Sequence, residues 1–356
     1  MIFTRKQRKY LSDWAQSLEP WTPGELPRGR RYVKLNTNES PFSPAPGVIT
    51  ALQAEAAQLR LYPDPACIAL RKSLAELHGI KPEQIFVGNG ANEVLAFCFA
   101  AFFAGATVRG ADISYAFFHT LARLSATTYQ TAPVLSNFSI DPGSLCGGAG
   151  VVLANPNAPT SLALPPGALR HIAENCAAHG SVLLVDEAYI NFGGESALPL
   201  LDTLDNVVAV RTFSKAYALA GQRVGYAMAH PALIEGLHKV QKSFNPHGVD
   251  RLAQATALAA ISDTAYTERC VAAVRAARLD FSNGLQEMGF SVLPSDANFV
   301  FARHPNHQGE ALQASLRGQG ILVRRFSEPR IADWLRITIG NNEEMGKTLN
   351  ALKSMM

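Results

Sequence analysis

The stretch Val182-Leu183-Leu184-Val185-Asp186-Glu187-Ala188-Tyr189 is a short apolar run that ends in two acids. An apolar run without polar alternation is typical of a strand covered on both faces of its sheet, so we expect a strand over 182–186. Similar runs lie at residues 84–87, 107–109, 150–154, 206–212 and 223–229. Helical patterns of ten or more residues accompany them, at 93–103, 166–178 and 231–242. This alternation predicts an α/β fold in which a mainly parallel sheet lies between two layers of helices.

The pattern of predicted helices and strands changes toward the C-terminal end of the chain. A long alanine-rich helical pattern over 264–288 is followed by strand-like runs at 290–293, 299–302, 321–325 and 334–339, with helices around 310–318 and at the end. We therefore expect a smaller α+β domain beside the large one. The predicted division is an N-terminal arm and part of the small domain in 1–45, a large domain in 46–245, and a small C-terminal domain in 246–356.

Composition places the chain among ordinary globular proteins. Its 356 residues are 47% hydrophobic and 17% charged, and 32 Lys and Arg against 29 Asp and Glu give a formal charge of +3. These values exclude a disordered or fibrous chain and a small disulfide-stapled fold. So small a positive charge offers little to a nucleic acid backbone, and we expect no nucleic-acid partner.

The sequence shows no sign of secretion, membrane insertion or metal binding. Its five cysteines are scattered without a Cys-x-x-Cys pair, which favours free thiols in a reducing cytosol and no zinc site. The basic N-terminus is followed by Leu11-Ser12-Asp13-Trp14 instead of an apolar signal core. The most apolar stretch, 94–106, is shorter than the roughly 20 residues that cross a bilayer. We expect a cytoplasmic protein.

Three motifs place polar residues at the ends of predicted strands, where open α/β sheets bind their ligands. Val87-Gly88-Asn89-Gly90-Ala91-Asn92-Glu93 runs through a glycine-containing turn into a helix, which is either a plain strand–turn–helix or a phosphate cup. Asp186 and Glu187 suit a charged ring nitrogen, a metal site or a helix cap. The third motif is Arg211-Thr212-Phe213-Ser214-Lys215, followed by Arg223. Its lysine is either a desolvated amine beside an anion site or a solvated surface group.

The three motifs together fit one small molecule. A phosphate cup, an acid that can face a protonated ring nitrogen, and an amine that can attack an aldehyde are the needs of pyridoxal phosphate. Lysine can lose its proton and form a Schiff base, whereas arginine cannot. We therefore predict pyridoxal phosphate as the cofactor.

With these residues in place, the chain resembles the histidinol-phosphate aminotransferases, within the fold-type I pyridoxal-phosphate-dependent enzymes. The likeness runs from Leu35-Asn36-Thr37-Asn38-Glu39-Ser40-Pro41, through Tyr62-Pro63-Asp64-Pro65, to Leu335-Arg336-Ile337-Thr338-Ile339-Gly340. It implies a large three-layer α/β/α domain with a smaller α+β domain, and a homodimer. It also implies transfer of an amino group from L-histidinol phosphate to 2-oxoglutarate, a step of histidine biosynthesis.

The resemblance also implies roles for individual residues. Lys215 would form the Schiff base and carry the proton during transamination, Asp186 would pair with the ring nitrogen, and Tyr189 would hydrogen-bond the phenolic oxygen of the cofactor. Further cofactor contacts would come from Ala91, Asn92, Tyr115, Asn157, Ser214, Arg223 and, across a subunit boundary, Tyr62. The substrate would meet Asn36, Trp21, Arg324 and Arg336.

Three positions depart from the family pattern and bear on the amino donor. Ala158 replaces the asparagine that normally precedes Pro-Thr and contacts the cofactor, a contact assigned here to Asn157. Ser161 replaces a glycine, so the turn must either avoid positive φ or tolerate strain. Trp21 replaces a tyrosine, and an indole does not reproduce the reach of a phenolic hydroxyl.

Four alternatives remain at the level of the sequence. An aromatic amino-acid aminotransferase and a threonine-phosphate decarboxylase share the scaffold. A ligand-sensing regulator would need a DNA-binding module, for which 1–39 is short. A dinucleotide-binding dehydrogenase would use Gly88 and Gly90, but it lacks the third glycine and leaves Lys215 without a role.

Overall fold

The computed structural model describes residues 10–26 and 31–356, and this part of the chain contains a seven-stranded sheet with the order β2-β8-β7-β6-β5-β3-β4. The strands are β2 (Ile85–Gly88), β3 (Thr107–Ala111), β4 (Thr128–Ala132), β5 (Gly150–Ala154), β6 (Leu183–Asp186), β7 (Val207–Thr212) and β8 (Gly225–Ala229). Strands β4, β3, β5, β6 and β7 run parallel to one another. The predicted mainly parallel sheet is therefore confirmed.

Strand β8 is the exception, because it runs antiparallel to both β7 and β2. The expectation that 223–229 joins the parallel set is wrong. The chain between β7 and β8 holds a loop and one short 3-10 helix, Ala220–Gln222, in place of the crossover helix that parallel neighbours need. The edge strand β4 was not predicted, since its sequence Thr-Tyr-Gln-Thr-Ala is mostly polar and exposed.

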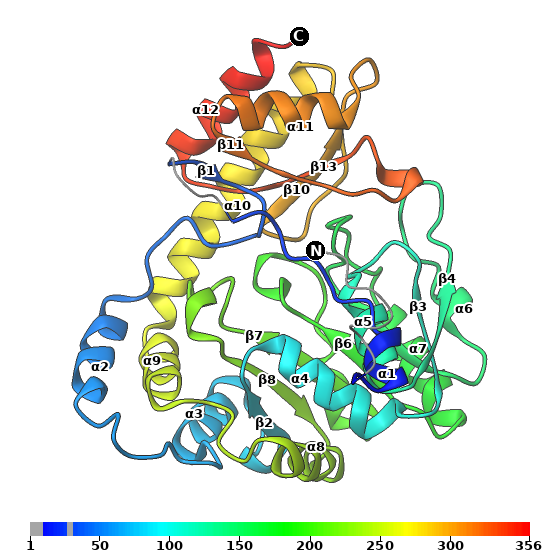
Figure 1. Cartoon of the computed structure of the whole chain (residues 1–356), viewed down its shortest axis with the longest axis vertical. Coiled ribbons are helices and arrows are strands. Elements are labelled where there is room, and N and C mark those ends of the chain that lie inside the picture. The colour runs from blue at the N-terminus through cyan, green and yellow to red at the C-terminus, as the bar shows by residue number, and fades with distance from the viewer. Residues whose placement is uncertain (1–9, 27–30) are drawn as a thin grey trace.

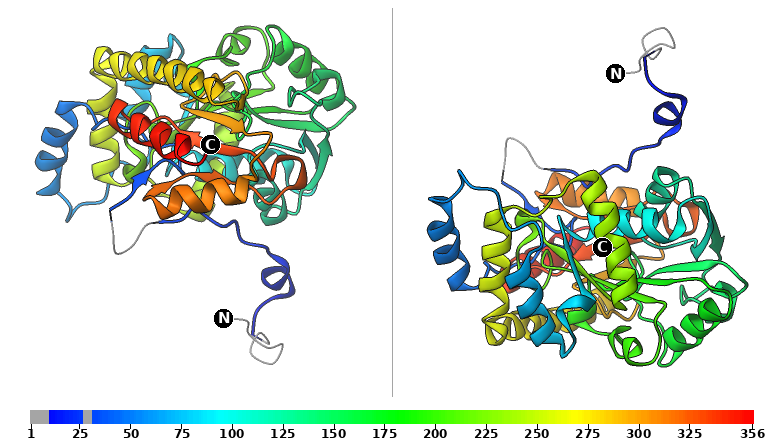
Figure 2. Two further views of the ribbon diagram at one scale, coloured as in Figure 1. Left: turned by 90° about the horizontal axis from the view of Figure 1, so that it is seen from above. Right: turned by 90° about the horizontal axis from the view of Figure 1, so that it is seen from below.

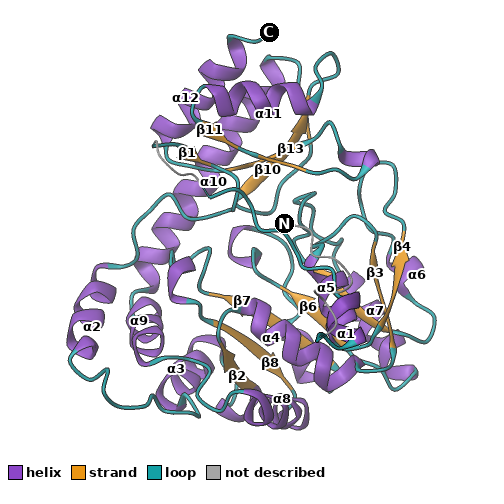
Figure 3. Ribbon diagram, viewed as in Figure 1, coloured by secondary structure: helices purple, strands orange, loops and turns teal. Residues whose placement is uncertain are grey.

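Helices cover both faces of this sheet, as Figures 1 and 3 show. They are α2 (Pro46–Ala56), α3 (Ile68–His78), α4 (Ala91–Cys98), α5 (Phe117–Leu124), α6 (Pro142–Leu145), α7 (Ala168–Ala178), α8 (Pro231–Phe244) and α9 (Arg251–Ile261). Successive side chains of β6 enter different cores: Leu184 packs with residues of α4, α5 and α8, and Val185 with residues of α3, α7 and α9. This alternation produces the three layers that the apolar run predicted.

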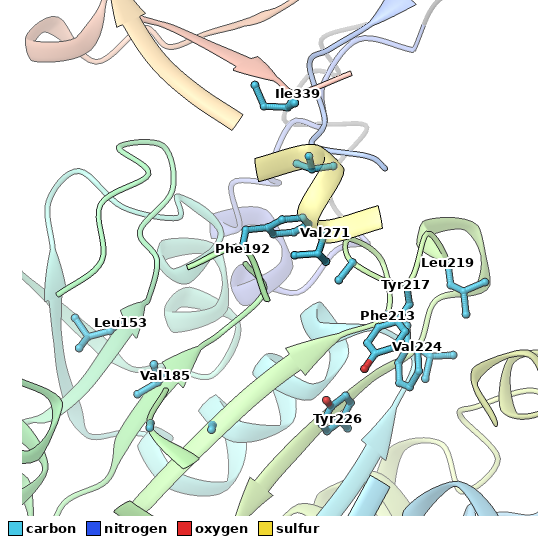
Figure 4. Packing of buried hydrophobic residues seen from close by; sticks show 14 of the residues in the cluster. Leu153, Val185, Phe192, Phe213, Tyr217, Leu219, Val224, Tyr226, Val271 and Ile339 are labelled. Carbon is cyan, nitrogen blue, oxygen red and sulfur yellow. The ribbon is translucent and has the colours of Figure 1, made fainter. Parts of the chain in front are cut away.

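The second core lies around Val185, Phe213, Tyr217 and Tyr226, and it reaches Val271 and Ile339 from the C-terminal part of the chain (Figure 4). Tyr226 is 1% exposed, and its hydroxyl lies 2.8 Å from Nε2 of His78. This continuous packing fixes the end of β7, from which the loop that contains Lys215 departs.

The C-terminal part forms a separate antiparallel sheet with the order β12-β13-β10-β9 (upper part of Figure 1). Its strands are β9 (Ser291–Val292), β10 (Phe299–Arg303), β12 (Arg324–Arg325) and β13 (Leu335–Thr338), and its helices are α10 (Thr264–Glu287), α11 (Gly309–Gly318) and α12 (Asn342–Lys353). β1 (Val33–Lys34) pairs in parallel with β11 (Ile321–Leu322), so the N-terminal segment joins the C-terminal part. The domain boundaries at 45 and 245 stay predictions.

The short helix α1 (Asp13–Ser17) buries none of its residues. The segment that carries it projects from the body in both views of Figure 2. In the described part of the chain, no helix is both long and apolar enough to cross a membrane. All five cysteines are free.

Candidate active site

A cavity of about 300 Å³ lies where β2, β5, β6 and β7 end, between the two sheets. This is the edge at which parallel strands gather polar side chains. Twelve of the fourteen predicted site residues line it: Trp21, Asn36, Ala91, Asn92, Tyr115, Asp186, Tyr189, Ser214, Lys215, Arg223, Arg324 and Arg336. The structure therefore brings together residues from three motifs, the N-terminal segment and the C-terminal sheet.

Lys215 follows β7 and extends its amine toward the N-terminal segment. Its Nζ donates a hydrogen bond of 2.9 Å to the carbonyl oxygen of Thr37. Burial lowers the pKa of Lys215 to about 8, and the charges of Arg336 and Arg223 act in the same direction while Glu39 opposes them. The amine is therefore partly neutral near pH 8, as a nucleophile or proton acceptor requires.

Asp186 ends β6 and is 6% exposed. Its Oδ1 accepts one hydrogen bond, from the N–H of Ala188 at 3.1 Å. Burial raises the pKa of Asp186 to about 7, against the opposing effects of that N–H group and of Lys215. A carboxyl in this setting gains strongly from a cation placed beside it, because the cation lowers its pKa.

The turn between β2 and α4 lies against Arg223. Gly90 has a φ of +83°, and a Cβ built there would lie 2.3 Å from Nη2 of Arg223. Gly225 is as restricted, since its Cβ would lie 2.3 Å from the backbone nitrogen of Ala91. The first turn of α4 presents N–H groups that have no intrahelical acceptor, and the Ser214 hydroxyl lies 3.4 Å from Nη1 of Arg223. This donor set suits a phosphate.

Two tyrosines form further walls of the cavity. Tyr115 donates its hydroxyl hydrogen to Oδ1 of Asn92 at 3.0 Å. Burial raises the pKa of Tyr115, so the phenol stays neutral. The ring of Tyr189 lies edge-on against Phe299 with 5.1 Å between centroids, and its hydroxyl accepts a hydrogen bond from Asn38.

Arg324 and Arg336 face each other across the register of β12 and β13. Nη2 of Arg336 donates to the carbonyl oxygen of Asn36 at 3.0 Å, and its buried Nε has no hydrogen-bond partner among the described residues. Burial lowers the pKa of each guanidinium. Within residues 10–26 and 31–356, no carboxylate lies at ion-pair distance from either arginine. The two cations therefore suit an anionic ligand.

Two predicted residues do not line the cavity. Asn157 is buried, and its amide is engaged with the Ser114 hydroxyl, the Ile113 carbonyl and the Thr160 hydroxyl, so it supports the structure around the cavity without lining it. Tyr62 is 80% exposed on the outer surface, where it stacks on His247. A cofactor contact by Tyr62 within its own chain is therefore absent from the described structure.

The departures from the family pattern have structural consequences. Ser161 has a φ of 66°, the left-handed conformation that glycine adopts without strain. Its hydroxyl donates to the carbonyl oxygen of Pro294 at 3.0 Å and so joins the two parts of the chain. Trp21 lines the cavity and packs edge-on against Phe117. It also lines a second cavity of about 500 Å³ that adjoins the first at Tyr115 and Arg324.

Sequence reasoning missed four residues of the N-terminal segment that line the cavity: Gly24, Thr37, Asn38 and Glu39. Thr37 acts through its backbone carbonyl, which no side-chain pattern reveals. Asn38 and Glu39 belong to the motif 35–41 that carries the family resemblance, and this was the signal that could have found them.

Comparisons with known proteins agree with this geometry. The family model "Aminotransferase class I and II" matches residues 30–352. A histidinol-phosphate aminotransferase 2 of Dechloromonas aromatica is 44% identical over 354 residues, 98% of this chain and 99% of that protein. A histidinol-phosphate aminotransferase 1 of Bordetella parapertussis is 46% identical over 353 residues, with the same coverage. The crystal structure of histidinol-phosphate aminotransferase from Sinorhizobium meliloti in complex with pyridoxal-5'-phosphate superposes with a TM-score of 0.86, at 27% identity over 100% of this chain and 99% of that one.

Proposed function

Because the chain belongs to the class I and II aminotransferase family, we propose that it transfers the amino group of L-histidinol phosphate to 2-oxoglutarate with pyridoxal phosphate as cofactor. The products are imidazole acetol phosphate and L-glutamate. The relatives named histidinol-phosphate aminotransferase match along 98% of the chain, so the activity is proposed for the whole protein.

The donor set of the cavity fits pyridoxal phosphate. Gly90 allows a close approach to Arg223, and the start of α4 adds N–H groups and Asn92, which together would hold the phosphate. Tyr115 would lie against the ring. When bound, the cofactor supplies an aldehyde for the amino group and a ring that accepts the electrons released at the substrate α-carbon.

Lys215 and Asp186 are the side chains that would take part in the reaction. Nζ of Lys215, with a pKa lowered to about 8, would take the proton from the substrate α-carbon and deliver it to C4′ of the cofactor. The Asp186 carboxylate would face the ring nitrogen and keep it protonated, since each charge stabilises the other at this buried position. Tyr189 would donate a hydrogen bond to the phenolic oxygen.

The observation that carries the choice of substrate is the pair of guanidinium groups without carboxylate partners in the described chain. L-Histidinol phosphate brings a phosphate, and glutamate and 2-oxoglutarate bring two carboxylates each. A planar guanidinium binds either group through two parallel hydrogen bonds. Arg324 would meet the phosphate or the distal carboxylate, and Arg336 the α-carboxylate of glutamate. The adjoining second cavity leaves room for the imidazole arm.

The function is tested by mixing the cofactor-loaded protein with one amino donor at a time and following the absorbance of the cofactor. We expect L-histidinol phosphate and L-glutamate to convert the cofactor to its amine form, and L-phenylalanine to do so far more slowly. A faster reaction with L-phenylalanine, or release of carbon dioxide from threonine phosphate without a keto acid, would contradict the proposal and support the matching alternative.

The Arg336→Ala variant refines this test. L-Histidinol phosphate has no α-carboxylate, so we expect the variant to slow the glutamate half-reaction more than the histidinol phosphate half-reaction. Loss of one charged hydrogen-bonded contact predicts roughly a tenfold to hundredfold effect on kcat/KM for glutamate. Equal losses in the two half-reactions would count against the role proposed for Arg336.

We further propose that the enzyme is a homodimer of the cytoplasm. The apolar side chains of Ile49, Leu59, Leu61 and Ile68 are exposed on the stretch of chain that contains Tyr62. The segment that carries α1 projects from the body (Figure 2), and its Trp14 is 50% exposed. These exposed apolar side chains are consistent with an interface between two copies of the chain. Tyr62 would then reach the phosphate site of a second copy. Light scattering tests the dimer, and Tyr62→Phe should weaken cofactor retention without changing the particle mass.

A further inference from the structure

Three consecutive residues of the N-terminal segment contact three groups of the proposed active site. The carbonyl of Asn36 accepts from Arg336, the carbonyl of Thr37 accepts from Lys215, and Nδ2 of Asn38 donates to the hydroxyl of Tyr189 at 2.9 Å. Two of these contacts use the backbone. Asn38 alone uses its side chain, so its identity determines the contact.

The neighbours of Asn38 fix which end of its amide meets Tyr189. The backbone N–H of Asn38 donates to Oγ1 of Thr338 at 2.9 Å, and Oγ1 lies 3.1 Å from Oδ1 of Asn38. Because the N–H group can only donate, the single hydroxyl proton of Thr338 is free to go to Oδ1. Oδ1 therefore faces Thr338, and the NH₂ group faces Tyr189.

This orientation decides the direction of the proton on Tyr189. An amide NH₂ group donates and does not accept, so the phenolic oxygen of Tyr189 is an acceptor in this contact. Its own proton has no acceptor among the described residues and remains available to a ligand in the cavity. Ala158 belongs to the small cluster against which Tyr189 packs, and its methyl side chain neither donates nor accepts a hydrogen bond.

The position of Asn38 is held tightly. Its side chain is 1% exposed, its φ is 56°, and its carbonyl oxygen accepts from Nδ2 of Asn298 at 3.1 Å. Asparagine tolerates this left-handed conformation better than most residues with a side chain. Thr338 and Asn298 belong to the C-terminal sheet region, whereas Tyr189 follows β6, so the contact spans the two parts of the chain.

We propose that Asn38 is a positioning residue that holds the Tyr189 hydroxyl as an acceptor, so that its proton points to the phenolic oxygen of the cofactor. The inference rests on the proposed function, because it takes Tyr189 as the contact to that oxygen. A hydrogen bond donated to the phenolate stabilises the deprotonated form of the bound cofactor. Asn38 thereby lowers the pH at which the bound cofactor changes its absorbance.

The test is a pH titration of the absorbance of the cofactor-loaded protein in the absence of substrate. Asn38→Asp replaces the donor with a carboxylate that takes the Tyr189 proton, and we expect the midpoint to rise by about one pH unit. Asn38→Ala removes the donor but does not draw the Tyr189 proton away from the cofactor, so we expect a smaller rise of the midpoint. A midpoint equal to that of the unchanged protein in both variants overturns the proposal.

A double-mutant cycle with Tyr189→Phe separates positioning from a general structural effect. If Asn38 acts through Tyr189, Asn38→Ala adds nothing to the midpoint in the Tyr189→Phe background. An equal shift in both backgrounds, or no shift in Tyr189→Phe itself, overturns the inference. Thr338→Val serves where the Asn38 variants do not fold, since it keeps the volume and removes only the hydroxyl that orients the amide; we expect a smaller rise, and no rise overturns the proposal.

This outcome is distinguishable from failure of the proposed function. A protein that does not retain the cofactor, or that retains it without reaction with L-histidinol phosphate, contradicts the function. A protein that passes both tests and shows no dependence of the midpoint on Asn38 contradicts the inference alone.

Discussion

Asp186 and Glu187 are adjacent at the end of β6, yet their surroundings differ. Glu187 is 1% exposed, and its carboxylate accepts hydrogen bonds from Nε of Arg211 at 2.9 Å, from the Ser196 hydroxyl and from the N–H of Ala197. Asp186 is almost as buried and accepts one hydrogen bond, from Ala188. Neighbouring residues of an extended chain point to opposite faces, so one acid enters the core and the other the cavity.

The difference separates a charge whose partners are supplied by the fold from one that is left for a ligand. A buried carboxylate with a full set of partners is stable where it lies, whereas one with a single partner has a raised pKa and gains from a ligand of opposite charge. The same contrast holds between Arg211, paired with Glu187, and Arg336, which has no carboxylate partner among the described residues. Incomplete pairing of buried charge therefore indicates the active site.

The largest expected effect is on Lys215, the cationic counterpart of Asp186. Lys215→Met should lower turnover by roughly 10⁴-fold, because it removes the group proposed to move the proton. The cofactor-free variant should be more stable than the unchanged protein near pH 7. A lysine whose folded pKa lies below its unfolded pKa costs stability below about pH 10.5, and in full below about pH 8.

Turnover and thermal denaturation, measured on the same preparations, check the predicted loss of activity and the predicted gain of stability. Lys242→Met, at an exposed position, is the matched control and should change neither quantity greatly. Loss of turnover together with a large loss of stability would mean that Lys215 is a structural charge like Glu187.

The second effect concerns the fully paired acid. Glu187→Ala leaves Arg211 buried without its partner, and loss of one member of a buried pair costs about 3–5 kcal/mol of unfolding free energy. Glu187→Gln keeps an acceptor for Ser196 and Ala197 and should cost less. Chemical denaturation measures the loss. Turnover of the folded fraction should change far less than in Lys215→Met, and a catalytic loss without a stability loss would reverse the comparison.

A smaller effect is the pH dependence of the cofactor-free protein. The folded pKa of Asp186, about 7, lies above the ordinary value of 3.8, so its contribution to stability is present below about pH 4 and is lost as pH rises through 7. Asp186→Asn should therefore raise the melting temperature at pH 8 and leave it unchanged near pH 4. Asp205→Asn, at an exposed position, is the control. A variant that is less stable at pH 8 would contradict this explanation.

The contrast between Asp186 and Glu187 also shows what could be predicted from the sequence. The apolar run 182–186 predicted a covered strand because its composition is local information, and Asp186 and Lys215 stood out because strand ends hold ligands. The partners of Glu187 and Asn38 could not be predicted, since Arg211 and Tyr189 lie 24 and 151 positions away in the chain. The polar edge strand β4 and the direction of β8 depend on pairing, which residue type alone does not specify.

The amine of Lys215 is proposed to bind the cofactor at the site where Asp186 would face its ring nitrogen. Borohydride reduction of the cofactor-loaded protein, followed by proteolysis and mass spectrometry, tests it most directly. We predict a single reduced cofactor adduct, on the peptide that contains Lys215. An adduct on another lysine, or none on a protein that binds the cofactor, would contradict the account.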